Sequence, residues 1–140
     1  MTNDQVTLYA IQGVIRDLPE FQRQGVYLAA AKLLGDLGVA YIHIAEVDWD
    51  DAPEMPVAFK EALRIIYSGT LIYAGKYTAE KAEAALAAGW ADLIGFGRPF
   101  VANPDLPYRL KHVLALNTPD ASTLFGGGAK GFTDYPFATP

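Results

Sequence analysis

The sequence predicts an α/β fold built around a parallel β-sheet. Four short segments, apolar along most of their length, are spread along the chain, and each has the length of a strand buried on both faces. A segment with helical spacing or helix-end signals follows each of them. Because the strand–helix order repeats four times, we expect the strands to run parallel.

The first two repeats occupy the N-terminal half of the chain. Their strands are expected at Val6–Ile11 and Val39–Ala45, which are rich in Val, Ile, Ala and Tyr. The first helix spans Val26–Leu37, is rich in Ala and Leu, and stops before Gly38, the residue type favoured just beyond a helix. The second helix spans Pro56–Tyr67, with proline in the first turn, where no backbone N–H is needed.

The last two repeats follow the same pattern. Their strands are expected at Thr70–Ala74 and Asp92–Phe96. The helix Ala79–Ala88 follows the third strand, with Thr78 as the N-cap residue whose side chain accepts a backbone hydrogen bond. The fourth helix is expected to begin near Pro104, in its first turn, and to end near residue 112.

Length and segment order together limit the architecture. The 140 residues suit a single domain over 1–140, with strand–helix units in 1–113 and a closing tail rich in glycine and proline in 114–140. A complete (β/α)8 barrel is excluded, because it needs about 200–250 residues. The alternatives that fit are a small doubly wound domain and half of an eight-stranded barrel.

Composition excludes several classes of function. The 11 Lys and Arg residues against 16 Asp and Glu give a formal net charge of −5, which argues against a nucleic-acid partner. The chain has no cysteine, so disulfides, thiolate catalysis and cysteine-based zinc sites are excluded. It shows neither a signal-peptide pattern nor an apolar run of the roughly 18 residues that span a membrane. We expect a cytoplasmic protein with no membrane partner.

Two turns that contain glycine, each after a predicted strand, are candidate anion sites. In the first, backbone N–H groups around Gly75 and Lys76 can meet an anion, and an ordinary strand–helix turn is the alternative. In the second, Gly97 lets the backbone approach a ligand and Arg98 adds a cation, while Pro99 is expected to limit helix formation. Phosphate sites of barrels lie after strands seven and eight.

Other residues that could carry chemistry have simpler interpretations. Gly126–Gly131 matches G-x-G-x-x-G, but too few residues follow it for the helix and strand of a dinucleotide-binding unit. Glu46–Glu54 lacks the EF-hand spacing and is interpreted as a solvated acidic loop. His43 is interpreted as a satisfied core histidine, and His112 ends a helix, where a cation is favourable. No metal site is predicted.

Several stretches of the sequence from about Leu37 onward match one known family in collinear order: Gly38–Glu46, Leu71–Thr78, Ile94–Leu106, Leu116–Pro119 and Phe125–Pro136. On these stretches the chain resembles the C-terminal part of the Old Yellow Enzyme family, FMN-dependent alkene reductases that include N-ethylmaleimide reductase.

The resemblance implies a (β/α)8 TIM barrel, of which this chain supplies the C-terminal half, strands five to eight, and the closing tail. It implies FMN as cofactor, NAD(P)H as transient reductant, and an enone or other activated alkene as the small-molecule substrate. By the same resemblance the two turns hold the FMN phosphate, Phe125 lies beside the flavin, and Trp49 lies on the rim of the barrel mouth. The implied cofactor-binding residues are Ala74, Gly75, Lys76, Gly97, Arg98 and Phe125.

The chain departs from the family pattern where catalysis is concerned. The family's flavin-contacting Arg on the fifth strand is absent from Val6–Gln12, and the match resumes at Gly13–Pro19. The family's substrate-anchoring His pair and proton-donating Tyr belong to the first half of the barrel, and His43 does not match that pair. No catalytic residue is therefore assigned to this chain.

Hypotheses of different classes follow from these observations. In the first, the chain is part of an FMN-dependent oxidoreductase, and a second copy in a homodimer or an N-terminal half-barrel partner covers the open sheet edges. In the second, the chain is a non-catalytic, truncated module that binds a flavin or a phosphate. The third is an unrelated small α/β domain.

Overall fold

The computed structural model describes residues 6–7, 20–46, 55–126 and 128–138, and the chain divides into two compact units, residues 1–95 and 96–140. In the described residues, the first unit holds a sheet and three helices, and the second holds two short helices and the closing tail. The expectation of a single domain over residues 1–140 stays a prediction.

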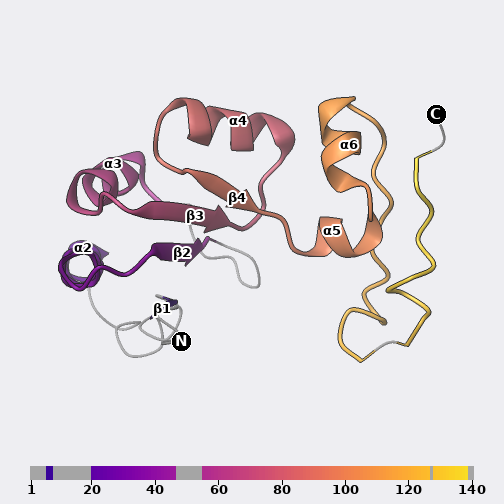
Figure 1. Cartoon of the computed structure of the whole chain (residues 1–140), viewed down its shortest axis with the longest axis horizontal. Helices are drawn as coiled ribbons and strands as arrows, with labels where there is room; N and C mark the ends of the chain where they lie inside the picture. The colour runs from indigo at the N-terminus through magenta and orange to yellow at the C-terminus, as the bar shows by residue number, and fades with distance from the viewer. Residues whose placement is uncertain (1–5, 8–19, 47–54, 127, 139–140) are drawn as a thin grey trace. The chain divides into compact units, whose positions relative to one another are not determined.

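The sheet of the first unit has four parallel strands in the order β1-β2-β3-β4 (Figure 1). The α/β class and the parallel direction of the strands are therefore confirmed. Each strand lies within the segment predicted for it, although residues 8–11 of the first segment lie outside the described residues. The strands are β1 Val6–Thr7, β2 Tyr41–Ala45, β3 Thr70–Ala74 and β4 Leu93–Gly95.

Three helices belong to the same unit: α2 Glu20–Asp36, α3 Val57–Ile66 and α4 Ala79–Ala87. Helix α2 begins earlier than the predicted Val26, whereas α3 and α4 agree with the prediction to within one residue at each end. The predicted N-cap of α4 is confirmed, because the Thr78 hydroxyl accepts a hydrogen bond from the backbone N–H of Lys81 at 3.3 Å.

The core of this unit lies between one face of the sheet and the helices. Alternate strand residues on that face, Ile42 and Ile44 of β2 and Leu71 and Tyr73 of β3, are at most 5% exposed. The residues between them on the same strands are only half-buried. The helices contribute Ala31, Phe59, Leu63 and Ala85 to the core. In the described residues, the second face of the sheet is therefore less covered than the first.

Strand register brings small residues together at the carboxyl end of the sheet. Ala45 of β2 pairs with Ala74 of β3, and Ala74 pairs with Gly95 of β4. In a parallel sheet the carboxyl ends of the strands share one edge, so the chain leaves β3 and β4 at neighbouring points. This is the edge at which open α/β sheets and barrels bind ligands.

The second unit contains the predicted fourth helix and one helix that was not predicted. Helix α6 Leu106–Lys111 lies within the segment predicted from near Pro104 to near residue 112, whereas α5 Arg98–Ala102 precedes that segment. Pro99 does not limit the helix, because it lies in the first turn of α5, where its missing N–H is not needed. Pro107, rather than Pro104, lies in the first turn of α6. The two proline errors have one cause, since proline signals a helix start as well as a helix stop.

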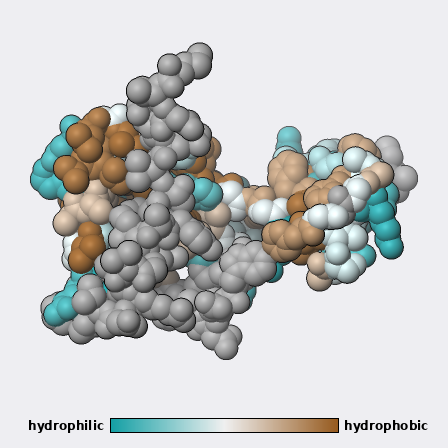
Figure 2. Space-filling model, turned by 90° about the horizontal axis from the view of Figure 1, so that it is seen from below, coloured by the Kyte–Doolittle hydropathy of each residue, from teal (hydrophilic) through white to brown (hydrophobic). Residues whose placement is uncertain are grey.

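Hydrophobic residues reach the surface of both units, as the brown areas of Figure 2 show. Those with at least two-thirds of their area exposed are Leu37 and Ile65 in the first unit and Val113, Phe125 and Phe137 in the second. No helix of the described residues is long and apolar enough to cross a membrane.

Candidate functional site

The first predicted turn, Ala74–Lys76, follows β3 and runs against the end of β2. The backbone N–H of Glu46 donates to the carbonyl oxygen of Ala74 at 2.6 Å. A Cβ on Gly75 would lie 2.5 Å from the Glu46 carbonyl oxygen, so another side chain requires the backbone to move. Lys76 is exposed to solvent. The glycine at this position is thus explained by close backbone packing, and the lysine beside it reaches water.

A buried ion pair lies behind this turn. The Nζ atom of Lys60, on α3, lies 2.7 Å from Oε1 of Glu46, and the two side chains are only 12% and 10% exposed. The hydroxyl of Tyr77 donates a hydrogen bond to Oε2 of the same carboxylate. The interpretation of Glu46 as part of a solvated loop is therefore wrong for this residue, because α3 and the turn cover it. Residues 47–54, with Trp49, lie outside the described residues.

Two further polar groups lie within the sheet. The Tyr73 hydroxyl and Nε2 of His43 are buried and have no hydrogen-bond partner among the described residues. Burial, and then the negative charge of Glu46, raise the pKa of Tyr73, so its phenol stays protonated at neutral pH. The interpretation of His43 as a core histidine with its hydrogen bonds satisfied is thus not supported for Nε2. This atom faces β4, since it lies 3.7 Å from where a Cβ on Gly95 would lie.

The second predicted turn belongs to the second unit. Gly97 is the N-cap residue of α5, and its carbonyl oxygen accepts a hydrogen bond from the N–H of Phe100 at 2.9 Å. Gly97 is exposed, and a Cβ placed on it would meet no atom within 4 Å. Arg98 is the first residue of α5 and is half-buried. Open space at Gly97 and a cation at Arg98 are compatible with an anionic ligand.

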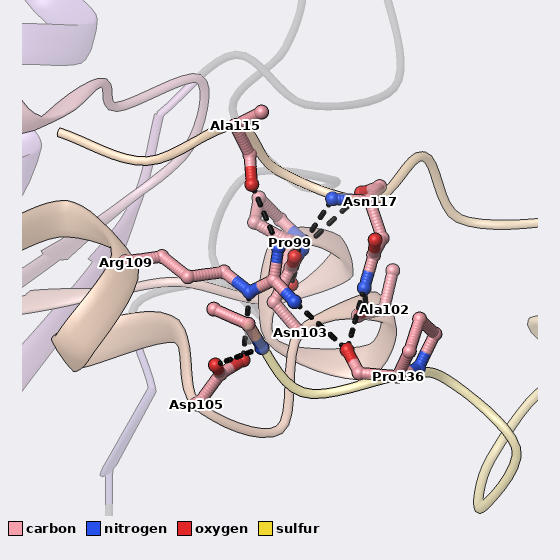
Figure 3. Close-up of polar contacts among 9 residues, drawn as sticks. Pro99, Ala102, Asn103, Asp105, Arg109, Ala115, Asn117 and Pro136 are labelled. Atoms are coloured by element: carbon pink, nitrogen blue, oxygen red, sulfur yellow. Dashed lines mark hydrogen bonds and ion pairs between the residues drawn. The ribbon is translucent and has the colours of Figure 1, made fainter. Parts of the chain in front are cut away.

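Two asparagines hold α5 to the closing tail (Figure 3). Asn103, which is fully buried, donates from Nδ2 to the carbonyl oxygens of Pro99 and Asn117 at 2.8 and 3.2 Å, and its Oδ1 accepts from the N–H of Asn117 at 2.8 Å. Asn117 in turn donates from Nδ2 to the carbonyl oxygen of Ala102 at 2.9 Å. These bonds satisfy carbonyls at the end of a helix that is too short to be stable alone.

Arg109 of α6 is the centre of a second group of contacts with the tail (Figure 3). Its side chain is 7% exposed and donates from Nε to Oδ1 of Asp105 at 2.7 Å. Nη1 donates to the carbonyl oxygen of Ala115 at 2.7 Å, and Nη2 to that of Pro136 at 2.8 Å. Oδ2 of Asp105 accepts from the N–H of Ala138 at 2.7 Å. Arg109 and Asp105 therefore fix two separate stretches of the tail to α6.

The tail itself closes into a loop that carries Phe125. The N–H of Asp120 donates to the Tyr135 hydroxyl at 2.8 Å, so the two ends of the loop meet. Phe125 lies between them in the sequence and is 76% exposed. After Gly131 the described residues contain neither a helix nor a strand.

The predicted site residues thus fall into two groups. Ala74, Gly75 and Lys76 form one continuous turn of the first unit, and Gly97, Arg98 and Phe125 belong to the second. The sequence analysis did not single out Lys60 or Tyr77, which lie beside the first turn. The sequence signal for them was weak: Lys60 lies on a predicted helix, and Tyr77 directly follows the predicted turn. In the part of the chain that the structure describes, no group of three or more His, Cys, Asp or Glu side chains could hold a metal ion.

Comparisons with known proteins all indicate the same protein family. The model of the NADH:flavin oxidoreductase / NADH oxidase family matches residues 14–117. A 12-oxophytodienoate reductase-like protein of Solanum lycopersicum is 39% identical over 109 residues, which cover 76% of this chain and 29% of that protein.

Solved structures give the same result. Morphinone reductase is 45% identical with a TM-score of 0.77, and the match covers 82% of this chain and 31% of that one. An old yellow enzyme homologue from Zymomonas mobilis is 38% identical with a TM-score of 0.70, and the match covers 79% and 32%. The chain thus spans about a third of the length of these TIM-barrel relatives. It belongs to the NADH:flavin oxidoreductase / NADH oxidase family, the family of the Old Yellow Enzymes.

Proposed function

We propose that this chain is the C-terminal part of an FMN-dependent NAD(P)H oxidoreductase that reduces activated alkenes, and that it contributes the site for the FMN phosphate. The observation that carries the proposal is the pairing of Ala74 with Gly95, which brings the ends of β3 and β4 side by side. Each of the two strands is followed in the sequence by one of the candidate turns, Ala74–Lys76 after β3 and Gly97–Arg98 after β4.

The residues of both turns fit a phosphate group. Proteins bind phosphate with backbone N–H groups of turns that contain glycine, together with Lys or Arg side chains. The first turn offers the backbone at Gly75 and the exposed ammonium of Lys76. The second offers the open space at Gly97 and the guanidinium of Arg98. Neither turn contains an acidic residue, so neither repels the anion by its own charge.

A flavin, when bound, supplies hydride transfer between a nicotinamide and the substrate. In this proposal the residues of this chain bind and orient the flavin: the two turns hold its phosphate, and Phe125 lies against its edge. Morphinone reductase has been solved in complex with tetrahydroNAD, which supports a nicotinamide as the reductant. We propose an enone or a related activated alkene as the substrate and a cytoplasmic location for the protein. The flavin-bleaching experiment described below also compares NADH with NADPH as the reductant.

We further propose that the chain supplies strands five to eight of a TIM barrel and that another half completes it. The less covered second face of the sheet and the match to about a third of each relative support this. The other half is a second copy of the chain or an N-terminal half-barrel. A mass measurement in solution separates these possibilities, because a dimer supports the first and a monomer that binds no second copy contradicts it.

The experiment that tests the function begins with FMN binding. We expect the purified chain to bind FMN by calorimetry and to show a flavin spectrum that NADPH or NADH bleaches and an enone restores. Arg98→Ala should weaken FMN at least tenfold more than riboflavin, because only FMN carries the phosphate. Lys32→Ala, which removes an equal charge from an exposed site on α2, is the control. Equal losses for FMN and riboflavin contradict the phosphate role of Arg98.

One observation favours the non-catalytic alternative. Residues Val6–Gln12 contain no Arg, whereas the family carries a flavin-contacting Arg in the corresponding strand. A chain that binds FMN but whose flavin is not bleached by either nicotinamide is a binding module rather than half of an active enzyme.

A further inference from the structure

We propose that Lys60 is a positioning residue that neutralises the Glu46 carboxylate behind the first turn, so that Glu46 can anchor the turn without repelling the anion that the turn binds. This inference rests on the proposed phosphate site and assigns a role to two residues that lie outside it.

Glu46 makes two hydrogen bonds to the turn and packs closely against Gly75. Its backbone N–H bonds to the carbonyl oxygen of Ala74, and its own carbonyl oxygen fills the space where a side chain on Gly75 would lie. Its carboxylate accepts the hydrogen bond from the Tyr77 hydroxyl. The chain is therefore fixed to Glu46 on both sides of Lys76. An anchor of this kind presets the backbone N–H groups that would meet a phosphate, which reduces the ordering cost of binding.

The anchor creates an electrostatic problem for an anion site. The Glu46 side chain is 10% exposed, so water screens its charge poorly. Its Cβ lies 3.2 Å from where a Cβ on Gly75 would lie, which places the carboxylate beside the turn. An unpaired carboxylate at this position would oppose the binding of a phosphate and would itself be costly to bury.

Lys60 removes that opposition. Its ammonium lies 2.7 Å from the Glu46 carboxylate and is 5.6 Å from the ring centroids of both Tyr73 and Trp90. Aromatic faces attract a cation at this distance, so the two rings and the carboxylate together hold the ammonium in one place. The pair is therefore neutral as a whole, and the exposed charge of Lys76 is not offset by a carboxylate behind it.

An ion pair that serves only to stabilise the fold makes a different prediction from one that neutralises charge. Loss of a purely structural pair leaves an unpaired buried carboxylate, which lowers the binding of FMN and riboflavin alike through the fold. Loss of a neutralising lysine lowers the binding of anions selectively, and removing the carboxylate charge as well restores it. The loss of preference for FMN over riboflavin in Lys60→Met separates the two roles. The double variant Lys60→Met with Glu46→Gln, which is neutral but lacks the ion pair, then shows whether the carboxylate charge causes that loss.

The test measures the affinity of the whole chain for FMN, riboflavin and inorganic phosphate by calorimetry. We expect Lys60→Met to weaken FMN and phosphate about tenfold or more and riboflavin less than about twofold, because charges at such sites interact over short, poorly screened distances. The double variant should return to within about threefold of the unaltered chain. The control is the exposed pair Lys32–Asp36, whose side chains are 66% and 62% exposed, with Lys32→Met alone and combined with Asp36→Asn. Neither control should change FMN affinity more than about twofold.

Circular dichroism checks that each variant is folded. Lys60→Arg, which keeps the charge, should bind FMN like the unaltered chain and covers the case in which Lys60→Met does not fold. Equal losses of FMN and riboflavin in Lys60→Met, a double variant that binds FMN no better than Lys60→Met, or a folded Lys60→Arg that has lost its preference for FMN would each overturn the role of Lys60.

The unaltered chain separates this inference from the proposed function. If it prefers FMN to riboflavin and Lys60→Met keeps that preference, only the role of Lys60 is refuted. If it binds phosphate but no flavin, the flavin function of the isolated chain fails, and the phosphate titrations still decide the role of Lys60. If it binds neither, the anion site and the inference fall together.

Discussion

Arg109 should be the most sensitive position of the second unit, and Arg109→Met tests this. The methionine fills part of the buried volume but removes every hydrogen bond of the guanidinium. Two of these go to the carbonyl oxygens of Ala115 and Pro136 at 2.7 and 2.8 Å. A hydrogen bond with a charged partner contributes about 1.5–3 kcal/mol, so the two together correspond to about 3–6 kcal/mol. The third partner, Asp105, is left without its cation.

The assay is hydrogen exchange followed by mass spectrometry, with a thermal melt beside it. Taking the lower figure of about 3 kcal/mol, and roughly 4–8 °C per kcal/mol for a small domain, the melting temperature of the second unit should fall by roughly 12–24 °C. Protection should be lost in α5, α6 and the tail and retained in β2 and β3, because the lost contacts all belong to the second unit.

Lys111→Met is the matched control, since it removes the same charge from an exposed position of the same helix. If Arg109→Met loses no more stability than Lys111→Met, or loses protection equally in both units, the reasoning from the Arg109 contacts is refuted.

Two further predictions concern the first unit. Gly75→Ala should lower stability measurably in a urea titration, because the new Cβ would lie 2.5 Å from the Glu46 carbonyl oxygen. Gly97→Ala is the control and should not lower stability, because its Cβ would meet no atom within 4 Å. Equal urea midpoints for the two variants would contradict this geometry. The backbone N–H of Leu71, and also Arg64, lower the pKa of Asp92 against the opposing effect of burial. The stability from this carboxylate is complete above about pH 4, the ordinary range of Asp, and is lost as the pH falls through its lowered pKa. The difference in urea midpoint between Asp92→Asn and the unaltered chain should therefore shrink from pH 6 to pH 2, and a constant difference would contradict the assignment.

Local signals were sufficient for much of the first unit. β3 was predicted at both ends because its apolar residues stand between glycines. The end of α2 just before Gly38 and the cap of α4 at Thr78 were also visible in the sequence, since both depend on residues close to the helix end. Gly75 was singled out correctly as a turn residue, although the sequence did not show that the Glu46 backbone is what requires it.

The failures arose where distant contacts decide the local structure. Helix α5 was not predicted, because Asn103 at its end bonds to Asn117 in the distant tail and the residues around Pro99 carry no unambiguous local signal for a helix. Glu46 was placed in a solvated loop because it begins an acidic run, and only α3 brings Lys60 to it. Buried polar networks of this kind depend on tertiary packing and leave no periodic signal in the sequence.

The contacts of α6 with the tail have a consequence for the order of folding during synthesis. Arg109 and Asp105 bond to each other four residues apart, but to Pro136 and Ala138 across 27 and 33 residues. A ribosome adds roughly 5–20 residues each second, so α6 emerges one or more seconds before its remaining partners exist. Throughout that interval the carbonyl group of Pro136 and the backbone N–H of Ala138 have not been made. A pause in translation before residue 136 should therefore leave the second unit open to proteases while the first is already folded.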